Sequence, residues 1–555
     1  MAMPYDNLLS DKKRRLEKVF GLRKGGGKVV EKKDAVALLE RLLVPGDRVC
    51  LEGDNQKQAD FFARQLCMLD PTRVNSLHMV QSSLVLPEHL QLFEKGIASR
   101  LDFAFSGPVS TRLAELVNAG TIRIGDIHTY LELHARYFID LTPRVSLVAG
   151  MYADREGNLY TGHNTEDTPT ICEATAFKQG IVVAQVSEIR ENLPRVDIPG
   201  SWIDLVVPVG EVPYVEPLFT RDPAGITDLQ VFLAMLVIKG IYEPYGIRSL
   251  NHGIGYAPQA IELLLPTYGK GLKGRICTHW ALNPHPTLIP AIEEGFVESV
   301  HSFGSEPGME EYCDRRQDIF FCGQDGSMRS SRTFCQLAGL YAIDCFLGAT
   351  LQIDRFGNSS TATRGRISGF GGAPNLGCNP PGRRHETQAY MKAGTEDSFL
   401  RNSIGSYPRG RKIVVQVTPT VSEKKKIPVF VEELDAVSMW REKKFNTPPV
   451  MIYGDQVTHI VTEKGIAFLN RCSDLAERMS AVRVVAGDTP VGRTVKPGET
   501  DFLRKKGVIA TPGDLGIDRK DASRELLAAQ SFDDLVRWSG GLYKVPEKCF
   551  SSRKN

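Results

Sequence analysis

The chain reads Asp154-Arg155-Glu156-Gly157-Asn158 and, further along, Asp354-Arg355-Phe356-Gly357-Asn358. Each copy of this D-R-x-G-N motif follows an apolar stretch, at residues 145–149 and 346–353 respectively. Each copy ends in Gly-Asn, and these two residue types readily adopt the positive φ angles of a tight turn. The same turn, following a predicted strand twice in the same order, indicates an internal duplication.

A second pair of similar stretches lies downstream of the two motifs. Residues 181–186 (IVVAQV) and 413–417 (IVVQV) are nearly continuous apolar runs, which are typical of strands covered on both faces. Near the N-terminus, a predicted helix at residues 35–43 precedes a predicted strand at residues 48–52, and such alternation favours an α/β class. We therefore predict an α/β fold of two tandem homologous halves, each an open α/β unit with a largely parallel sheet.

The repeat and the local composition suggest where each part begins and ends. We predict a basic N-terminal arm at 1–33, an N-terminal half at 34–224, a C-terminal half with a glycine-rich loop at 225–490, and a C-terminal extension at 491–555 with a helix near 521–538. A ligand cleft is expected between the halves, because α/β proteins commonly bind ligands in crevices at such junctions. The basic arm is interpreted either as a solvated segment with one helix or as an electrostatic dock for an anionic partner.

Composition excludes several classes of function. The 555 residues include 68 Lys and Arg against 66 Asp and Glu, a net charge of +2 that argues against a nucleic-acid partner. The longest apolar stretch, residues 229–238, is far shorter than the roughly 20 residues that cross a bilayer. We expect no membrane contact and no secretory signal, and hence a cytoplasmic protein. The 11 cysteines form no C-x-x-C pair, so no metal site is expected.

Two glycine-dense loops in the second half are candidates for ligand binding. Asn251, Gly253 and Gly255 precede a predicted helix at 259–265, an arrangement that suits an anion, although a structural turn explains it equally well. Residues 365–384 carry little side-chain bulk, which favours close approach to main-chain N–H groups, as in an oxyanion hole, over a flexible linker. We predict Gly371 and Gly372 as its main-chain donors. The basic residues beside this loop could neutralise a carboxylate or phosphate; they are Arg383, Arg384 and His385.

Several of these motifs together resemble family I coenzyme A transferases and acetyl-CoA hydrolases. The resemblance covers residues 34–490 and is carried by motifs in the family's order. They are the two D-x-x-G-N turns, Phe105-Ser106-Gly107-Pro108, residues 191–196 (ENLPRV), residues 203–207 (IDLVV), the loops at 251–255 and 368–373, and residues 461–467 (VTEKGIA). Within this superfamily, the chain most resembles the α subunits of bacterial malonate decarboxylases, with citrate lyase α subunits as the nearest functional analogue.

The resemblance implies an acyl-carrier-protein transferase. Acetyl-S-carrier protein and malonate would give malonyl-S-carrier protein and acetate, and partner β and γ subunits would decarboxylate the malonyl thioester. The thiol would belong to a phosphoribosyl-dephospho-CoA group on a small δ subunit, the acyl carrier protein. The chain would bind this group without carrying it covalently. The residues expected to bind substrate or thioester are Asn251, Gly253, Gly255, Trp280, Gly369, Asn375 and Arg383.

The chain departs from the family at the nucleophile. Family I transferases use a glutamate, but the corresponding stretch here is residues 276–281 (ICTHWA), which has no carboxylate; Glu293, Glu294 and Glu306 come later. We therefore predict that the malonate carboxylate itself attacks the thioester through a mixed anhydride, with Trp280 shaping the acid pocket. The alternatives are a CoA transferase or hydrolase with a glutamyl intermediate, a citrate lyase α-like transferase, or a non-catalytic scaffold for a carrier protein.

Overall fold

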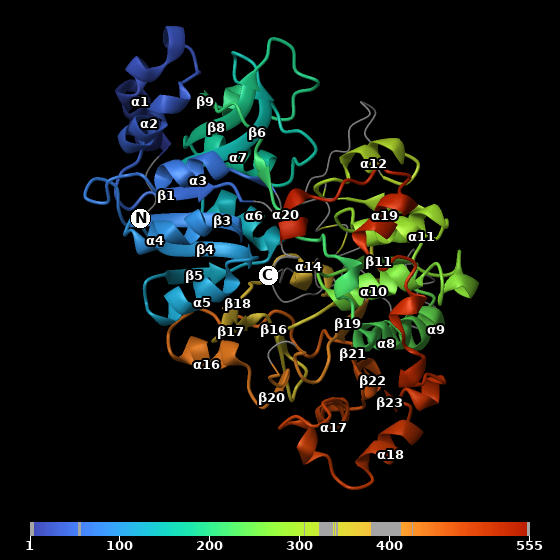
Figure 1. The fold of residues 1–555 in the computed structure, drawn as a ribbon. Coiled ribbons are helices and arrows are strands. Elements are labelled where there is room, and N and C mark those ends of the chain that lie inside the picture. The colour runs from blue at the N-terminus through green and yellow to red at the C-terminus, as the bar shows by residue number, and fades with distance from the viewer. Residues whose placement is uncertain are drawn as a thin grey trace.

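The computed structural model describes residues 5–53, 57–302, 304, 306–320, 337, 339, 342–378, 412–423 and 426–551. Two α/β halves, each built on an eight-stranded sheet, form the molecule (Figure 1). The predicted fold class is confirmed. Arg383, Arg384 and His385 lie outside the described residues.

The first sheet has the strand order β5-β4-β3-β1-β6-β8-β9, with every neighbouring pair parallel. All eight residues of β3 are buried, as expected for a strand covered on both faces. The strands are β1 (Arg48–Leu51), β3 (Leu77–Leu84), β4 (Ala98–Ser106), β5 (Arg123–Ile127), β6 (Val145–Ala153), β8 (Ile181–Ile189) and β9 (Leu205–Pro208), with β7 (Leu159–Tyr160) antiparallel to β6. The helices are α1 (Tyr5–Lys18), α2 (Ala35–Leu42), α3 (Asp60–Leu66), α4 (Pro87–Glu94), α5 (Ser110–Asn118), α6 (Tyr130–Ile139) and α7 (Thr168–Phe177).

The second sheet has the order β13-β12-β11-β14-β19-β21-β22-β23 and is parallel from β13 to β21. Its strands are β11 (Ser249–His252), β12 (His279–Ala281), β13 (Ser299–His301), β14 (Cys345–Gly348), β19 (Ile413–Val417), β21 (His459–Thr462), β22 (Gly465–Phe468) and β23 (Ile509–Ala510). The helices are α8 (Asp228–Val237), α9 (Glu243–Tyr245), α10 (Tyr256–Leu264), α11 (Ile289–Glu293), α12 (Glu310–Arg315), α14 (Ala373–Leu376), α16 (Asp435–Arg441), α17 (Leu475–Val485), α18 (Glu499–Lys505), α19 (Phe532–Trp538) and α20 (Glu547–Ser551). Short ladders pair β2 (Lys57–Gln58) with β10 (Tyr214–Val215), β15 (Gln352–Asp354) with β16 (Ser359–Ser360) and β20 (Phe430–Val431), and β17 (Ala362–Thr363) with β18 (Arg366–Ile367).

The two D-R-x-G-N motifs fold into the same turn. In the first, the backbone N–H and the amide of Asn158 donate to the Asp154 carboxylate over 2.8 and 2.7 Å. In the second, Asn358 donates to Asp354 in the same way, over 2.9 and 2.8 Å. The glycine between them has a φ of 87° in the first turn and 82° in the second. The expected turn is confirmed in both places.

The basic N-terminal segment is packed against the first half. Arg15 is 6% exposed and pairs with the carboxylates of Asp47 and Asp11, and Lys12 pairs with Asp204 at 2.9 Å. These contacts neutralise part of the positive charge of the segment. The segment is therefore packed on the first half, and it is not the free arm that the sequence predicted.

Two features of the C-terminal region differ from the sequence expectation. The chain after residue 490 adds β23 to the edge of the second sheet, antiparallel to β22. The helix expected at 521–538 is confined to α19, because Ser531 accepts a hydrogen bond from the N–H of Asp534 and so caps the helix at that point.

Segments of the second half also reach the first. β18 packs on α5, Asn118 donates to the Arg364 carbonyl over 2.8 Å, and Asn446 donates to the Gly125 carbonyl over 2.6 Å. In Figure 1, α16, β17 and β18 lie next to α5 of the first half. One continuous apolar core therefore includes residues of both halves.

Candidate functional site

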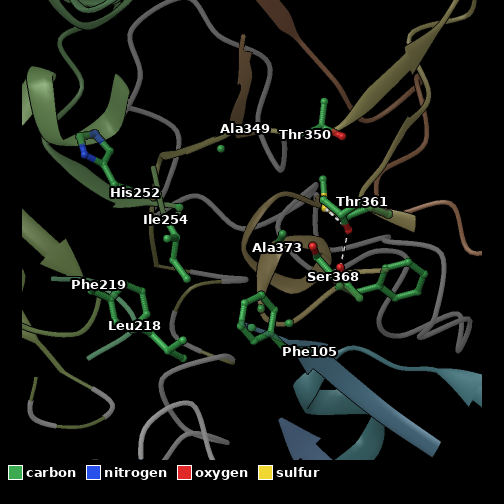
Figure 2. Close-up of a pocket in the computed structure, with 18 of the residues that line it drawn as sticks. Phe105, Leu218, Phe219, His252, Ile254, Ala349, Thr350, Thr361, Ser368 and Ala373 are labelled. Atoms are coloured by element: carbon green, nitrogen blue, oxygen red, sulfur yellow. Dashed lines mark hydrogen bonds between the residues drawn. The ribbon is translucent and has the colours of Figure 1, made fainter. Parts of the chain in front are cut away.

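A cavity of about 570 Å³ lies where the two halves meet, as the sequence predicted for a ligand cleft. The first half contributes the end of β4 and the start of α6. The segment that connects the halves, residues 216–221, contributes another wall and is called the linker below. The second half contributes the ends of β11 and β14 and residues 368–373, called the glycine loop. In Figure 2, Leu218 and Ile254 lie on one side of the cavity, across from Ser368 and Ala373.

The glycine loop is tightly bound to the first half. The N–H groups of Phe370 and Gly371 both donate to the carbonyl oxygen of Ala104 in β4, over 2.7 and 2.9 Å. Gly369 has a φ of 71°, and a Cβ atom there would lie 2.4 Å from the same oxygen. Only glycine allows this crossing, because any side chain would meet the β4 backbone. Phe370 is 4% exposed and lies within the interface, so the loop is not a surface linker.

The two glycines predicted as oxyanion donors differ in this arrangement. Because Gly371 already donates its N–H to Ala104, it is not free to stabilise an oxyanion, and that part of the prediction needs correction. The N–H of Gly372 has no acceptor within the part of the chain that the structure describes, and Gly372 lines the cavity. Of the two, Gly372 alone remains a candidate main-chain donor.

The linker is held in place by a buried glutamate. One oxygen of Glu306 accepts hydrogen bonds from the N–H of Phe219 at 2.9 Å, and from the N–H and hydroxyl of Thr220, both at 2.8 Å. Gln259 of α10 donates to the Phe219 carbonyl over 2.9 Å. Burial raises the pKa of Glu306 to about 8, although these donors and the nearby Arg221 guanidinium act to lower it. Hydrogen bonds with Glu306 and Gln259 therefore fix the backbone of the two residues that precede Arg221.

Two arginines line the cavity. Arg221, at the end of the linker, donates to the Leu218 carbonyl over 3.0 Å, and Arg366 of β18 donates to the Ser110 hydroxyl over 3.0 Å. Neither guanidinium forms an ion pair with a carboxylate of the described residues. Burial lowers the pKa of both, and each guanidinium remains charged at neutral pH. Two uncompensated positive charges make this cavity suitable for an anion.

His252, at the end of β11, belongs to a buried hydrogen-bonded cluster. Its two ring nitrogens contact the Tyr242 hydroxyl at 2.7 Å and the Glu262 carboxylate at 2.9 Å. Glu262 also accepts hydrogen bonds from His285 at 3.2 Å and from the Thr287 hydroxyl at 2.5 Å. Burial lowers the pKa of His252, although Glu262 acts to raise it. The cluster forms a rigid, polar floor beneath the apolar cavity wall.

The structure brings together five of the nine predicted site residues. Those that line the cavity are Asn251, Gly253, Gly369, Gly371 and Gly372. Two of these have structural hydrogen bonds, because the Asn251 amide donates to the Ala281 carbonyl and the Gly253 N–H donates to the Leu347 carbonyl over 2.7 Å.

Three other predicted residues lie outside the cavity lining. Trp280 is 2% exposed and packs edge-on behind His252, with ring centroids 4.7 Å apart. Gly255 is the residue before α10, and Asn375 is buried within α14. Trp280 thus supports the cavity floor and does not form the acid pocket. Arg383, the ninth residue, lies outside the described residues.

Sequence reasoning missed Arg221 and His252. Arg221 lies in the segment that joins the two predicted halves. Its place at the junction where a cleft was expected was the one feature of the sequence that could have indicated it. His252 is within the Asn251–Gly255 motif but was not singled out.

The position and partners of a glutamate decide whether it can act as the nucleophile. Glu293 accepts hydrogen bonds from Tyr312 at 2.6 Å and Arg316 at 2.5 Å, away from the cavity, and Glu306 lies behind the linker. Glu216 does line the cavity, but it is 4% exposed and Lys548 of α20 donates to both its oxygens, over 2.9 and 2.6 Å. A carboxylate held in this way is a weak nucleophile because its charge is neutralised.

Two kinds of feature are absent from the described residues. Their His, Cys, Asp and Glu side chains form no group that could hold a metal ion. Among the helices that the structure describes, none has the length and apolar character needed to span a membrane.

The chain is similar to known proteins over nearly its whole length. Residues 5–552 match the family model described as malonate decarboxylase, alpha subunit, transporter. The chain is 56% identical over 549 residues to the acetyl-S-ACP:malonate ACP transferase of Malonomonas rubra, and the match covers 98% of each chain.

Solved structures agree with the sequence matches. A Pseudomonas malonate decarboxylase hetero-tetramer in complex with malonate matches with a TM-score of 0.90, 55% identity and 99% coverage of both chains. A malonate decarboxylase alpha subunit from Acinetobacter baumannii matches with a TM-score of 0.89 and 51% identity, covering 98% of this chain and 99% of that one. The putative citrate lyase alpha subunit of Streptococcus mutans shares the fold, with a TM-score of 0.57 and 15% identity over 91% of this chain and 86% of that one.

Proposed function

Because the chain belongs to the family of malonate decarboxylase alpha subunits, we propose that it is an acyl-carrier-protein transferase. It exchanges acetyl for malonyl on a carrier-protein thiol: acetyl-S-carrier and malonate give malonyl-S-carrier and acetate. The relative from Malonomonas rubra, which matches over 98% of both chains, is named for this reaction. The observation that carries the proposal is the cavity between the halves. It brings together the main-chain N–H of Gly372, which has no acceptor among the described residues, and two guanidiniums that form no ion pair with the described carboxylates.

The proposed mechanism begins with attack by a malonate carboxylate oxygen on the thioester carbonyl carbon. The C–S bond breaks, the thiolate leaves, and a mixed acetic–malonic anhydride remains. The thiolate then attacks the malonyl carbonyl, the C–O bond to acetate breaks, and acetate is released. Both steps pass through a tetrahedral oxyanion, and the N–H of Gly372 is the donor that would stabilise it.

The energetic requirements of this route are modest for an enclosed site. Removal of one oxyanion donor costs about 3–4 kcal/mol where it has been measured. Correct placement of two reacting groups supplies about 7–11 kcal/mol. The cavity walls come from both halves and are joined by main-chain hydrogen bonds, which favours such placement. An external carboxylate can then replace the missing glutamate.

The proposed partners follow from this reaction. The thiol belongs to a phosphoribosyl-dephospho-CoA group on a small δ subunit, and β and γ subunits decarboxylate the product. A related solved structure is a malonate decarboxylase hetero-tetramer, which supports an assembly of several subunits. The chain itself carries no covalent prosthetic group in this proposal.

A label-transfer experiment tests the reaction. The assembled complex, with its carrier in the acetylated form, is incubated with ¹⁴C-malonate under conditions that block decarboxylation. We expect acid-stable label on the carrier and stoichiometric release of acetate. A scaffold subunit would transfer no label, and that result would overturn the proposal.

A pair of substitutions at one position tests the oxyanion donor. Gly372 has a φ of −84°, which proline can adopt, so Gly372→Pro removes the N–H with little change of backbone path. Gly372→Ala is the matched control because it keeps the N–H. We expect a loss of about 100- to 1,000-fold in acyl exchange for the proline variant, and a small effect for the alanine variant. Equal losses would refute the assignment of Gly372.

Mass spectrometry separates the direct route from a glutamyl intermediate. After incubation with the acyl donor, the direct route leaves the mass of this chain unchanged. A stoichiometric acyl or thioester adduct, on Glu216 or another carboxylate, would replace the mixed-anhydride route with covalent catalysis.

A further inference from the structure

The cavity offers more positive charge than the transfer of an acetyl group requires. Acetate has one carboxylate, and in the proposed mechanism that carboxylate is the reacting group. Malonate has a second carboxylate that takes no part in bond formation and stays charged throughout. Burial of this second charge in an apolar cavity is costly unless a cation pairs with it. A fixed guanidinium away from the reacting atoms would therefore distinguish malonate from acetate.

We infer that Arg221 binds the non-reacting carboxylate of the dicarboxylic acid and so determines the specificity of the site. This inference rests on the proposed transferase function and adds the residue that recognises the substrate. Arg221 is partly buried, lines the cavity and uses one terminal nitrogen on the Leu218 carbonyl. Its remaining N–H groups form the planar fork that suits a carboxylate.

The surroundings of Arg221 hold it in a defined place. The two residues before it are hydrogen-bonded through their N–H groups to Glu306, and Gln259 holds the carbonyl of Phe219. At the start of the linker, Lys548 of α20 donates hydrogen bonds to both carboxylate oxygens of Glu216. These contacts fix the backbone from which Arg221 projects, and the hydrogen bond to the Leu218 carbonyl directs its guanidinium. A cation placed in this way favours a ligand that is long enough to reach it.

Arg366 is less suited to this role. It lies on the short β17–β18 ladder and is more exposed than Arg221, and its Nε already donates to the Ser110 hydroxyl of the first half. The positive charge of Arg366 contributes to lowering the pKa of Arg221. Arg366 therefore strengthens the positive potential of the cavity, whereas Arg221 forms the directed contact.

The test compares two exchange reactions in the same assembled complex. The first is exchange of ¹⁴C-malonate into the acyl-carrier thioester, which needs the second carboxylate to be bound. The second is exchange of ¹⁴C-acetate with acetyl-S-carrier, which does not. When the proposed reaction runs backwards, acetate attacks the malonyl thioester, so the site accepts acetate as an attacking acid. We therefore expect the wild-type complex to catalyse the second exchange as well, by attack of acetate on the acetyl thioester, loss of the thiolate, and return of the thiolate to either carbonyl of the resulting acetic anhydride.

Arg221→Met keeps much of the side-chain volume and removes the charge. We expect kcat/KM for malonate exchange to fall at least about 30-fold, the loss typical of removing one partner of a buried charge pair. Acetate exchange should fall less than about threefold. Arg221→Lys restores the charge without the fork and should recover part of the malonate rate. Arg537→Met, at an arginine 74% exposed on α19, is the control for loss of one positive charge elsewhere.

The outcomes separate this inference from the proposed function. If the wild-type complex exchanges neither acid, the proposed function fails. If it exchanges both but Arg221→Met lowers both rates equally, or neither, Arg221 does not recognise the second carboxylate. If Arg221→Met reduces the amount of folded protein, Arg221→Lys takes its place in the test. A folded lysine variant that exchanges malonate and acetate in the same ratio as the wild type would also refute the inference.

Discussion

The crossing of the glycine loop over β4 makes a specific prediction for Gly369→Ala. At Gly369 the loop lies against the backbone of the first half, so a single methyl group acts directly on the junction between the halves. We expect this substitution to lower the stability of the protein and to reduce acyl exchange by displacing the loop from the cavity. The effect comes from the backbone and needs no change in charge or polarity.

The expected loss in the free energy of unfolding follows from the geometry of the loop. The new Cβ would lie 2.4 Å from the Ala104 oxygen and 3.1 Å from Phe103 Cε2, so the loop must move. A positive φ costs a residue with a side chain about 1–2 kcal/mol. Movement also weakens the hydrogen bonds from Phe370 and Gly371 to Ala104, each worth about 1 kcal/mol. Together these effects lower the free energy of unfolding by about 3–4 kcal/mol.

Gly371→Ala is a matched control in the same loop. Gly371 also has a positive φ, of 56°, but its added Cβ would meet only Tyr130 at 3.5 Å and Phe105 at 3.6 Å, which are ordinary contacts. We therefore expect about 1–2 kcal/mol of destabilisation from φ alone. Urea titration of the wild type and both variants measures the difference, and acyl exchange is measured in parallel. If the two alanine variants prove equally stable, the close packing of Gly369 on β4 is refuted.

Two further predictions concern buried charges. The pKa of Glu306 is raised from 4.5 to about 8 in the folded state, so between these pH values the folded state holds a proton that the unfolded state releases. The contribution of Glu306 to the free energy of unfolding is therefore fully present below about pH 4.5 and is lost as the pH rises to about 8. Thermal melts from pH 5 to 9 should show this decline in the wild type and not in Glu306→Gln, and parallel profiles would contradict it. Arg15→Met should cost roughly 3 kcal/mol, because Asp47 loses an ion pair and Asp11 keeps only those with Arg14 and Arg144. Exposed Lys13→Met should change stability by less than about 0.5 kcal/mol. Equal urea midpoints for the two variants would mean that the N-terminal segment is not structurally anchored.

Elements whose contacts are close in sequence were predictable. The D-x-x-G-N turn forms because Asn158 and Asn358 each bond to an aspartate four residues earlier, so its geometry is encoded within five residues. The strands at 181–189 and 413–417 follow from apolar runs that only a doubly covered sheet can bury. These local signals, repeated in the same order, sufficed to predict two α/β halves with a cleft between them.

The start of α19 was not predictable from periodicity alone. The apolar pattern around residue 521 extends the apparent helix upstream, but residues 524–526 form a separate short turn and Ser531 caps the helix. Several serines and aspartates in this region could each cap a helix. Asp518 and Ser523 cap short 3-10 helices, whereas Ser531 caps α19.

The chemistry of the site was decided by contacts between distant parts of the chain. The sequence indicated residues 371 and 372 as possible donors, but the carbonyl of Ala104, in the other half, accepts a hydrogen bond from the N–H of Gly371, whereas the N–H of Gly372 has no acceptor in the described part of the chain. In the sequence, nothing distinguishes Arg221 from other arginines of connecting segments. Its position in the fold is set by Glu306, far along the chain, which fixes the backbone before it. Hydrogen bonds within a few residues are specified by sequence alone. Those that join the halves exist only once the whole fold has closed, because burial and partner choice are properties of the packed molecule.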